Sequence, residues 1–269
     1  MTFAGLAGDF AAELELAMQL ADAADVLSMS RYRASDLVVT TKPDATPVTE
    51  ADQAVERMIR ATLADRRPTD DIVGEEFGGD RALAQGRRWI VDPIDGTKNY
   101  MRGVPVWSTL IGLAIDDRVV VGVVSAPAMG RRWWAATGAG AWTRDVDGSE
   151  RELRVSAVGA ISDASFSYSD AVDWDRHAVT QGALQRVIDA TWRQRGYGDF
   201  LSHMLVAEGA VDVSAEPTLA AWDMAALIPV IEEAGGKATG YSGGSPLAQL
   251  SLIATNGLLH EAVVAMVTA

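Results

Sequence analysis

The sequence contains no cysteine at all. This absence excludes cysteine nucleophiles, disulfide bonds and thiolate metal sites. It is compatible with a reducing compartment, so we expect a cytoplasmic protein. Histidine is also scarce, and the three histidines, His177, His203 and His260, have no spacing typical of a metal site. His203 falls among apolar residues of an expected helix, which favours a place in the core or at an interface.

Positive charge is in short supply, because 23 lysine and arginine residues stand against 37 aspartate and glutamate residues, for a net charge of −14. An acidic protein repels polyanions at long range, so we expect neither nucleic acid nor an anionic membrane surface as a partner. A phosphate substrate would need local positive charge. That charge would come from arginine or from divalent cations, which an acidic site attracts.

Long apolar runs are missing near the N-terminus. The stretch 3–27 carries five acidic residues, and it has neither a basic segment nor an uninterrupted apolar run. We therefore expect neither a signal peptide nor a membrane span there.

What the sequence does have is the composition of a globular protein, with 269 residues of which 48% are hydrophobic and 22% charged. Apolar periodicity and turn signals predict mixed α and β elements in layers, with a boundary near residue 150. The polar segment 40–47 is expected to be a loop. The expected helices span 10–28, 49–67, 176–189, 200–209, 223–234 and the last dozen residues, and the expected strands lie at 72–73, 89–91, 107–126 (a hairpin), 133–142, 191–195, 211–215 and 251–255.

The most informative stretch is Asp92-Pro93-Ile94-Asp95-Gly96-Thr97, which follows the apolar residues 89–91. A strand that ends in a Pro-X-Asp-Gly turn directs both aspartates to one side, with the Ile94 carbonyl, the Gly96 amide and the Thr97 hydroxyl nearby. Paired carboxylates at a strand end suit Mg²⁺, and a helix that begins near Thr97 offers free N–H groups to a phosphate. An isolated Asp-Gly pair would indicate only a tight turn. The whole hexapeptide favours a functional site.

Carboxylates elsewhere in the N-terminal half have ordinary explanations when each is taken alone. Glu75 and Glu76 follow an expected strand, as a metal ligand would, but adjacent glutamates are more often a solvated surface pair. Asp52, three residues after Thr49, is an acidic residue in the first turn of a helix, where it stabilises the helix dipole. Its functional alternative is to orient a metal-bound water together with Thr97.

Three acidic positions of the C-terminal half have the same two interpretations. Asp223, directly after Trp222, would be the N-cap of a helix or a further metal ligand. Glu216 ends an expected strand and would face the same opening. Asp199 would cap the helix that follows it or, in a cleft, bind a cationic or hydroxylated substrate.

Together these segments resemble the inositol monophosphatase superfamily, a group of lithium-sensitive, Mg²⁺-dependent phosphatases. The resemblance covers nearly the whole chain, and it is carried in order by Lys42-Pro43-Asp44, residues 47–52, Gly74-Glu75-Glu76, the hexapeptide at 92–97, Trp222-Asp223 and residues 233–236. It implies an α+β fold, a layered α-β-α-β-α sandwich of the inositol-monophosphatase-like sugar phosphatase type, usually a homodimer. It also implies an N-terminal half, 1–150, with most metal ligands and a C-terminal half, 151–269, with Asp223 and the substrate-side residues.

The resemblance further implies a role for individual residues. It implies about two or three Mg²⁺ ions in the site, which assist the in-line attack of water on phosphorus. The implied metal ligands are Glu75, Asp92, Asp95, Asp223 and the Ile94 carbonyl, the phosphate contacts are Gly96 and Thr97, the residues that activate the water are Asp52, Thr97 and Glu75, and the substrate contacts are Asp199, Glu216 and Trp222.

Within the superfamily the chain is similar to the histidinol-phosphate phosphatases of actinobacteria, through Lys98 and residues 103–107, 131–134 and 197–200. The two anionic residues Asp199 and Glu216 suit the ammonium and imidazole groups of histidinol better than a neutral polyol. The alternative substrates are inositol 1-phosphate, fructose 1,6-bisphosphate and a 3′-phosphonucleotide. An alternative from another class is a phosphate-binding regulator without catalytic activity.

Overall fold

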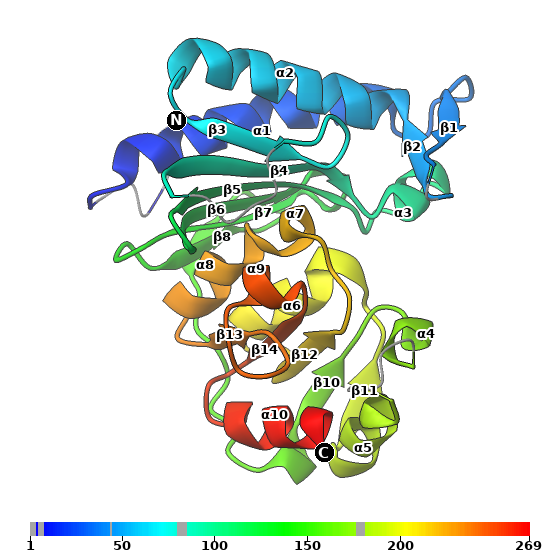
Figure 1. Ribbon diagram of the computed structural model, residues 1–269, viewed down its shortest axis with the longest axis vertical. Helices are drawn as coiled ribbons and strands as arrows, with labels where there is room; N and C mark the ends of the chain where they lie inside the picture. The colour runs from blue at the N-terminus through cyan, green and yellow to red at the C-terminus, as the bar shows by residue number, and fades with distance from the viewer. Residues whose placement is uncertain (1–3, 5–7, 44, 80–84, 176–180) are drawn as a thin grey trace.

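The computed structural model describes residues 4, 8–43, 45–79, 85–175 and 181–269, and its elements are stacked in layers (Figure 1). A helix pair, a seven-stranded sheet, a group of short helices, a five-stranded sheet and a last group of helices follow one another along the long axis. The α-β-α-β-α sandwich predicted from the sequence is confirmed. This stacking lets each sheet bury both of its faces. Asp44, His177 and the predicted helical residues 176–180 lie outside the described residues.

The first sheet has the strand order β3-β4-β5-β6-β7-β8-β9. Its strands are β3 (Asp71–Gly74), β4 (Arg87–Asp95), β5 (Ser108–Ile115), β6 (Arg118–Ala126), β7 (Arg131–Ala136), β8 (Ala141–Arg144) and β9 (Glu150–Glu152). Two long helices, α1 (Ala11–Arg31) and α2 (Glu50–Arg66), cover its outer face and share a buried apolar cluster with it. Because β3 and β4 are parallel, their carboxyl ends lie side by side.

The second sheet has the order β11-β10-β12-β14-β13. Its strands are β10 (Ser165–Ser167), β11 (Arg193–Arg195), β12 (Val213–Glu216), β13 (Lys237–Thr239) and β14 (Leu252–Thr255). Four short helices lie between the two sheets: α6 (Asp199–Ala207), α7 (Ala221–Met224), α8 (Leu227–Glu233) and α9 (Pro246–Gln249). The last layer holds α4 (Ala171–Trp174), α5 (Ala183–Ala190) and α10 (His260–Thr268). The strands of the first sheet end at Glu152 and those of the second begin at Ser165, close to the boundary predicted near residue 150. The division of the chain into two halves at that boundary remains a prediction.

Several segments differ from the predicted elements. The polar segment 40–47 is not simply a loop, because its ends pair antiparallel as β1 (Val39–Thr41) and β2 (Pro47–Thr49). The helix predicted over 223–234 is divided between α7 and α8 at Ala225 and Ala226. Pro229 explains this division, because its ring nitrogen has no hydrogen to donate to the carbonyl of Ala225. Strand β13 and helix α9 have no counterpart among the predicted elements, since each is only one turn or a few residues long.

The packing of the first sheet is visible in one pair of neighbours on β7. Trp133 and Trp134 are both fully buried, but Trp133 belongs to the apolar cluster with the middle helices and Trp134 to the cluster with α1 and α2. Successive side chains of a strand point to opposite faces of a sheet. The pair therefore fills both interfaces of the first sheet at one place. None of the helices in the described ranges is both long and apolar enough to cross a membrane.

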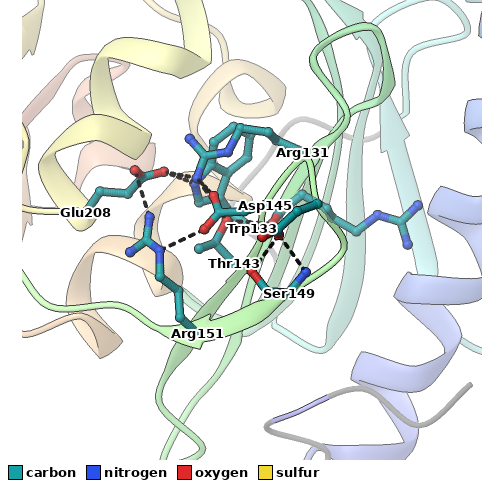
Figure 2. A network of polar contacts seen from close by, with 9 residues as sticks. Arg131, Trp133, Thr143, Asp145, Ser149, Arg151 and Glu208 are labelled. Carbon is teal, nitrogen blue, oxygen red and sulfur yellow. Dashed lines mark hydrogen bonds and ion pairs between the residues drawn. The ribbon is translucent and has the colours of Figure 1, made fainter.

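A polar network fixes the end of α6 against the first sheet (Figure 2). The Glu208 carboxylate, directly after α6, accepts hydrogen bonds from Trp133 Nε1 at 2.5 Å and from Arg151 at 3.0 Å, and pairs with Arg131 at 2.9 Å. Asp145 contacts the same two arginines. The Arg131 guanidinium also lies 4.7 Å from the centre of the Trp133 ring. Because these groups come from β7, β9, the residue after β8 and the residue after α6, the network fixes this helix relative to the sheet.

Candidate metal and phosphate site

The carboxyl end of β4 brings the motif aspartates together. The ladder between β4 and β5 changes register between Asp92 and Asp95, which are the last two residues of β4 that pair with β5. Both aspartates therefore lie at the carboxyl end of this strand. Asp223, the third residue of α7 and not its N-cap, approaches from the middle helix layer, and ligand oxygens of all three aspartates lie within 4.8 Å of one another. The predicted convergence of these three residues is observed.

Burial makes this three-aspartate cluster costly without a cation. Burial, with the charges of neighbouring carboxylates, raises the pKa of Asp92 and of Asp95 well above the ordinary range, and raises the pKa of Asp223 to about 7. Among the described residues, no group donates a hydrogen bond to the buried oxygen Oδ1 of Asp92. A divalent cation bound between the three carboxylates would satisfy this oxygen and favour the ionised forms. The donor set therefore fits a hard metal ion, and protons compete with that ion for the same oxygens.

Glu75 belongs to a second group of carboxylates beside the first. Backbone pairing of Gly74 with Val91 places Glu75 next to Asp92 across the parallel strands. Oxygens of Glu75, Glu76 and Asp52 lie within 4.8 Å of one another. The Glu75 charge also contributes to the raised pKa of both Asp92 and Asp223. The structure thus brings all four carboxylates predicted as metal ligands into one region, as two adjoining groups.

Lys42, on the ribbon of β1 and β2, provides the positive charge of the second group. Its Nζ donates to Glu75 at 2.6 Å and to Glu76 at 2.7 Å. Although burial lowers the pKa of Lys42, the hydrogen bonds to both glutamates raise it overall. Burial raises the pKa of Glu76 to about 7 despite the opposing effect of Lys42. The sequence did not predict the contacts of Lys42 with Glu75 and Glu76, because they join two segments more than 30 residues apart.

Glu56 of α2 holds the turn that carries Glu75. The fully buried Glu56 carboxylate accepts the backbone N–H groups of Glu76 at 2.7 Å and Phe77 at 3.2 Å, and its charge is paired with Arg60. Gly74 is required beside it, since a Cβ at this position would lie 2.1 Å from Glu56 Oε1. No sequence signal identified Glu56, because it occupies an ordinary position in an amphipathic helix.

The substitution Gly74→Ala is expected to move the Glu56 carboxylate or the turn, and so to misplace Glu75. We expect a loss of about 1–3 kcal/mol in the free energy of unfolding, as for other overpacked buried sites, with weaker binding of divalent cations. Gly159→Ala is the matched control, because a Cβ there meets nothing within 4 Å. Urea unfolding and cation titration measure both effects, and equal behaviour of the two variants would contradict this role of Gly74.

Thr97 and Asp52 form the predicted pair beside the metal cluster. Thr97 Oγ1 lies 3.1 Å from both Asp52 Oδ1 and the Ile94 carbonyl oxygen, so its hydroxyl donates to one of them. The other oxygen of Asp52 accepts the backbone N–H of Thr49 at 2.9 Å. Asp52 is therefore both the N3 residue of the capping box of α2, whose N-cap is Thr49, and the partner of Thr97. Burial raises the pKa of Asp52, while its hydrogen bonds oppose that shift.

The short helix α3 (Thr97–Met101) begins at Thr97, as predicted, with Gly96 as its N-cap. Gly96 has φ +85°, and a Cβ there would lie 3.0 Å from the Val106 carbonyl oxygen and 3.3 Å from Asp199. Glycine is thus needed for both the conformation and the close approach. The arrangement leaves the Thr97 hydroxyl and the Gly96 backbone beside the carboxylates, and phosphate binding by these two groups remains a prediction.

A polar cavity of about 160 Å³ opens next to the three aspartates. It is lined by Asp95, Asp199, Phe200, His203, Glu216, Leu219 and Asp223. The predicted substrate contacts Asp199 and Glu216 share this cavity, whereas Trp222 lines a separate, mostly apolar cavity of about 330 Å³. Burial and the Glu216 charge raise the pKa of Asp199 to about 6, partly offset by Lys98. The roles of Asp199, Glu216 and Trp222 in substrate binding remain predictions.

His203 was expected in the core or at an interface, and it is buried with 1% of its surface exposed, but its ring forms part of the wall of this cavity. Its Nε2 lies 3.0 Å from Glu216 Oε1. One sequence signal was available, because Asp199 and His203 are four residues apart and so share a face of the expected helix.

Comparison with known proteins places the chain among phosphatases. The model of the inositol monophosphatase family matches residues 11–269. The chain is 52% identical to the histidinol-phosphatase of Mycobacterium tuberculosis over 96% of this chain and 98% of that protein, and 51% identical to the histidinol-phosphatase of Streptomyces coelicolor over 94% and 96%. Its structure is similar to that of the Thermotoga maritima IMPase, with a TM-score of 0.82, 30% identity and coverage of 95% and 96%.

Proposed function

Since this chain belongs to the inositol monophosphatase family and is a phosphoric monoester hydrolase, we propose that it hydrolyses L-histidinol phosphate to L-histidinol and phosphate with Mg²⁺. The observation that carries this substrate assignment is the cavity beside the three aspartates, whose walls include the carboxylates of Asp199 and Glu216. Two anionic groups at the alcohol side favour a leaving group that is cationic. The names of two relatives at 51% and 52% identity agree with that chemistry.

In this proposal Glu75, Asp92, Asp95, Asp223 and the Ile94 carbonyl hold the metal ions. Bound Mg²⁺ supplies the positive charge that polarises the phosphoryl group and lowers the pKa of a bound water. The Gly96 backbone and the Thr97 hydroxyl hold the phosphate oxygens. These contacts fix the phosphorus atom in line with the attacking water. Holding the two reacting groups in this geometry lowers the entropic part of the barrier to the reaction.

Asp52 and Thr97 orient the attacking water. A hydroxyl has one hydrogen to donate, and the ionised Asp52 carboxylate, 3.1 Å away, attracts it more strongly than a neutral carbonyl. The lone pairs of Thr97 Oγ1 are then free to accept a hydrogen bond from the water. The proton released in the attack passes toward this pair. The bond from phosphorus to the ester oxygen breaks, and that oxygen takes up a proton from solvent water, while Asp199 and Glu216 bind the departing alcohol through its ammonium group.

Four further properties of the proposed enzyme follow from its family and from its composition. We expect about two or three Mg²⁺ ions per site, inhibition by lithium, a homodimer and a cytoplasmic location. The substrate is a small phosphate monoester, whichever of the candidate compounds it is.

A comparison of substrates tests this proposal. Phosphate release is measured at saturating Mg²⁺ with histidinol phosphate, inositol 1-phosphate, fructose 1,6-bisphosphate and adenosine 3′,5′-bisphosphate. We expect kcat/KM for histidinol phosphate to exceed the others by at least about 100-fold, because its ammonium group pairs with carboxylates that a neutral polyol leaves uncompensated. Equal or better turnover of another substrate would overturn the substrate assignment. Absence of turnover with all four would favour the non-catalytic regulator.

A further inference from the structure

His203 and Glu216 form a buried pair in the wall of the polar cavity. His203 is 1% exposed and Glu216 is 9% exposed, and their Nε2 and Oε1 atoms are 3.0 Å apart. They come from different elements, α6 and β12, so neither the helix nor the strand alone fixes their approach. This contact therefore depends on how the middle helix layer packs against the second sheet.

The chemistry of the two groups decides which one donates. An ionised carboxylate has only acceptor oxygens, so Nε2 carries the hydrogen and donates it to Glu216. In neutral imidazole, Nδ1 is then an acceptor, and it has no hydrogen-bond partner among the described residues. The second carboxylate oxygen of Glu216, Oε2, also receives no hydrogen bond within the described part of the chain. His203 thus binds one oxygen of Glu216 and leaves the other for a ligand in the cavity.

Helix α6 is well placed to keep this geometry. At its first turn, the backbone N–H of Phe200 donates to Asp95 Oδ2 at 2.9 Å. At its other end, Glu208 is held by Trp133, Arg131 and Arg151 (Figure 2). His203 lies between these two anchored ends. Its ring therefore has a fixed position relative to both the metal cluster and β12.

We propose that His203 is a positioning residue for substrate selection, which orients the Glu216 carboxylate so that Oε2 faces the cationic group of the leaving alcohol. This inference rests on the proposed function, because it assumes a substrate with an ammonium or imidazole group beside the scissile phosphate. A carboxylate that rotates freely loses part of its binding energy to ordering when a ligand arrives. His203 removes that cost in advance and has no contact with the phosphate itself.

Two amide substitutions of His203 provide a matched pair for the test. Glutamine places its amide near the position of Nε2 and can still donate to Glu216, whereas asparagine reaches only the position of Nδ1. We expect His203→Asn to raise KM for histidinol phosphate about tenfold, the ordinary effect of one hydrogen bond to a charged group, with kcat changed less than about twofold. His203→Gln is expected to stay within about threefold of the unmodified enzyme in KM.

Two further measurements separate positioning from a purely structural role. The KM for p-nitrophenyl phosphate, which has no cationic group, is expected to be the same in all variants, and its turnover shows that each variant is folded. In a Glu216→Gln background, His203→Asn should have no further effect on KM for histidinol phosphate. If His203→Asn does not fold, His203→Phe serves as a second variant without a donor.

The outcomes distinguish this inference from the proposed function. If the unmodified enzyme does not prefer histidinol phosphate, the substrate assignment fails before any variant is measured. If the preference holds and His203→Asn binds histidinol phosphate normally, the inference about His203 alone is overturned. The same conclusion follows if KM rises equally for both substrates, or if the effect persists in full without the Glu216 charge.

Discussion

The Asp92→Asn variant is expected to lose at least about 1,000-fold in turnover, because an amide cannot replace a carboxylate that neutralises metal charge, and metal catalysis contributes several kcal/mol to the rate. Asp92 connects the two carboxylate groups, since it is beside Glu75 on the parallel strands and its ligand oxygen lies within 4.8 Å of those of Asp95 and Asp223. Steady-state phosphate release over a range of Mg²⁺ concentrations measures the loss, and excess Mg²⁺ should not restore the rate.

Stability measurements show whether this loss reflects metal binding or folding. In the absence of metal, burial and neighbouring charges disfavour the ionised form of Asp92. The Asp92→Asn variant should then unfold at the same or a higher temperature than the unmodified protein. Added Mg²⁺ should raise the unfolding temperature of the unmodified protein but not that of the Asp92→Asn variant. Asp117→Asn, on the exposed β5–β6 hairpin, is the control. Near-normal turnover by the Asp92→Asn variant would count against the site.

Replacement of Thr97 by valine is expected to reduce kcat about 100- to 1,000-fold, in the range of a lost general-base relay. Valine keeps the shape of threonine but removes the hydroxyl that lies 3.1 Å from Asp52. Thr97→Ser, which keeps the hydroxyl, should remain within about tenfold of the unmodified enzyme. Both are measured at saturating substrate and Mg²⁺, so that weaker binding does not enter the comparison.

Binding of divalent cations separates the two parts of this argument. Since Thr97 is proposed to act on water and phosphate, Thr97→Val should bind Mg²⁺ nearly as well as the unmodified protein. A valine variant with a kcat within about fivefold of normal would remove Thr97 and Asp52 from the mechanism. A valine variant that no longer binds the metal would assign Thr97 to the metal site instead.

The part of this structure that the sequence predicted is the part controlled by local patterns. Apolar periodicity located α1, α2 and the hairpin of β5 and β6, and the capping signal at Thr49 located the start of α2. The hexapeptide at 92–97 predicted the strand end and the helix that follows it. These features depend on residues close in the chain, so a single sequence contains them.

The contacts that were missed join residues far apart in the chain. Lys42 reaches Glu75 and Glu76 from the ribbon of β1 and β2, and Glu56 reaches the same turn from α2. Their partners are fixed only by how the ribbon and helix pack on the sheet, which no local pattern specifies. His203 was expected in the core or at an interface, and it is buried, but its contact with Glu216 depends on how α6 packs against β12.

Anomalous diffraction from crystals soaked in Mn²⁺ tests the central claim most directly, because Mn²⁺ takes the same oxygen ligands as Mg²⁺ and scatters strongly. We predict one peak among the carboxylates of Asp92, Asp95 and Asp223, and a second between Asp92 and Glu75, with Lys42 moved away from Glu75. Crystals that show these four side chains without a metal peak between them, or a peak at another place, would contradict the account.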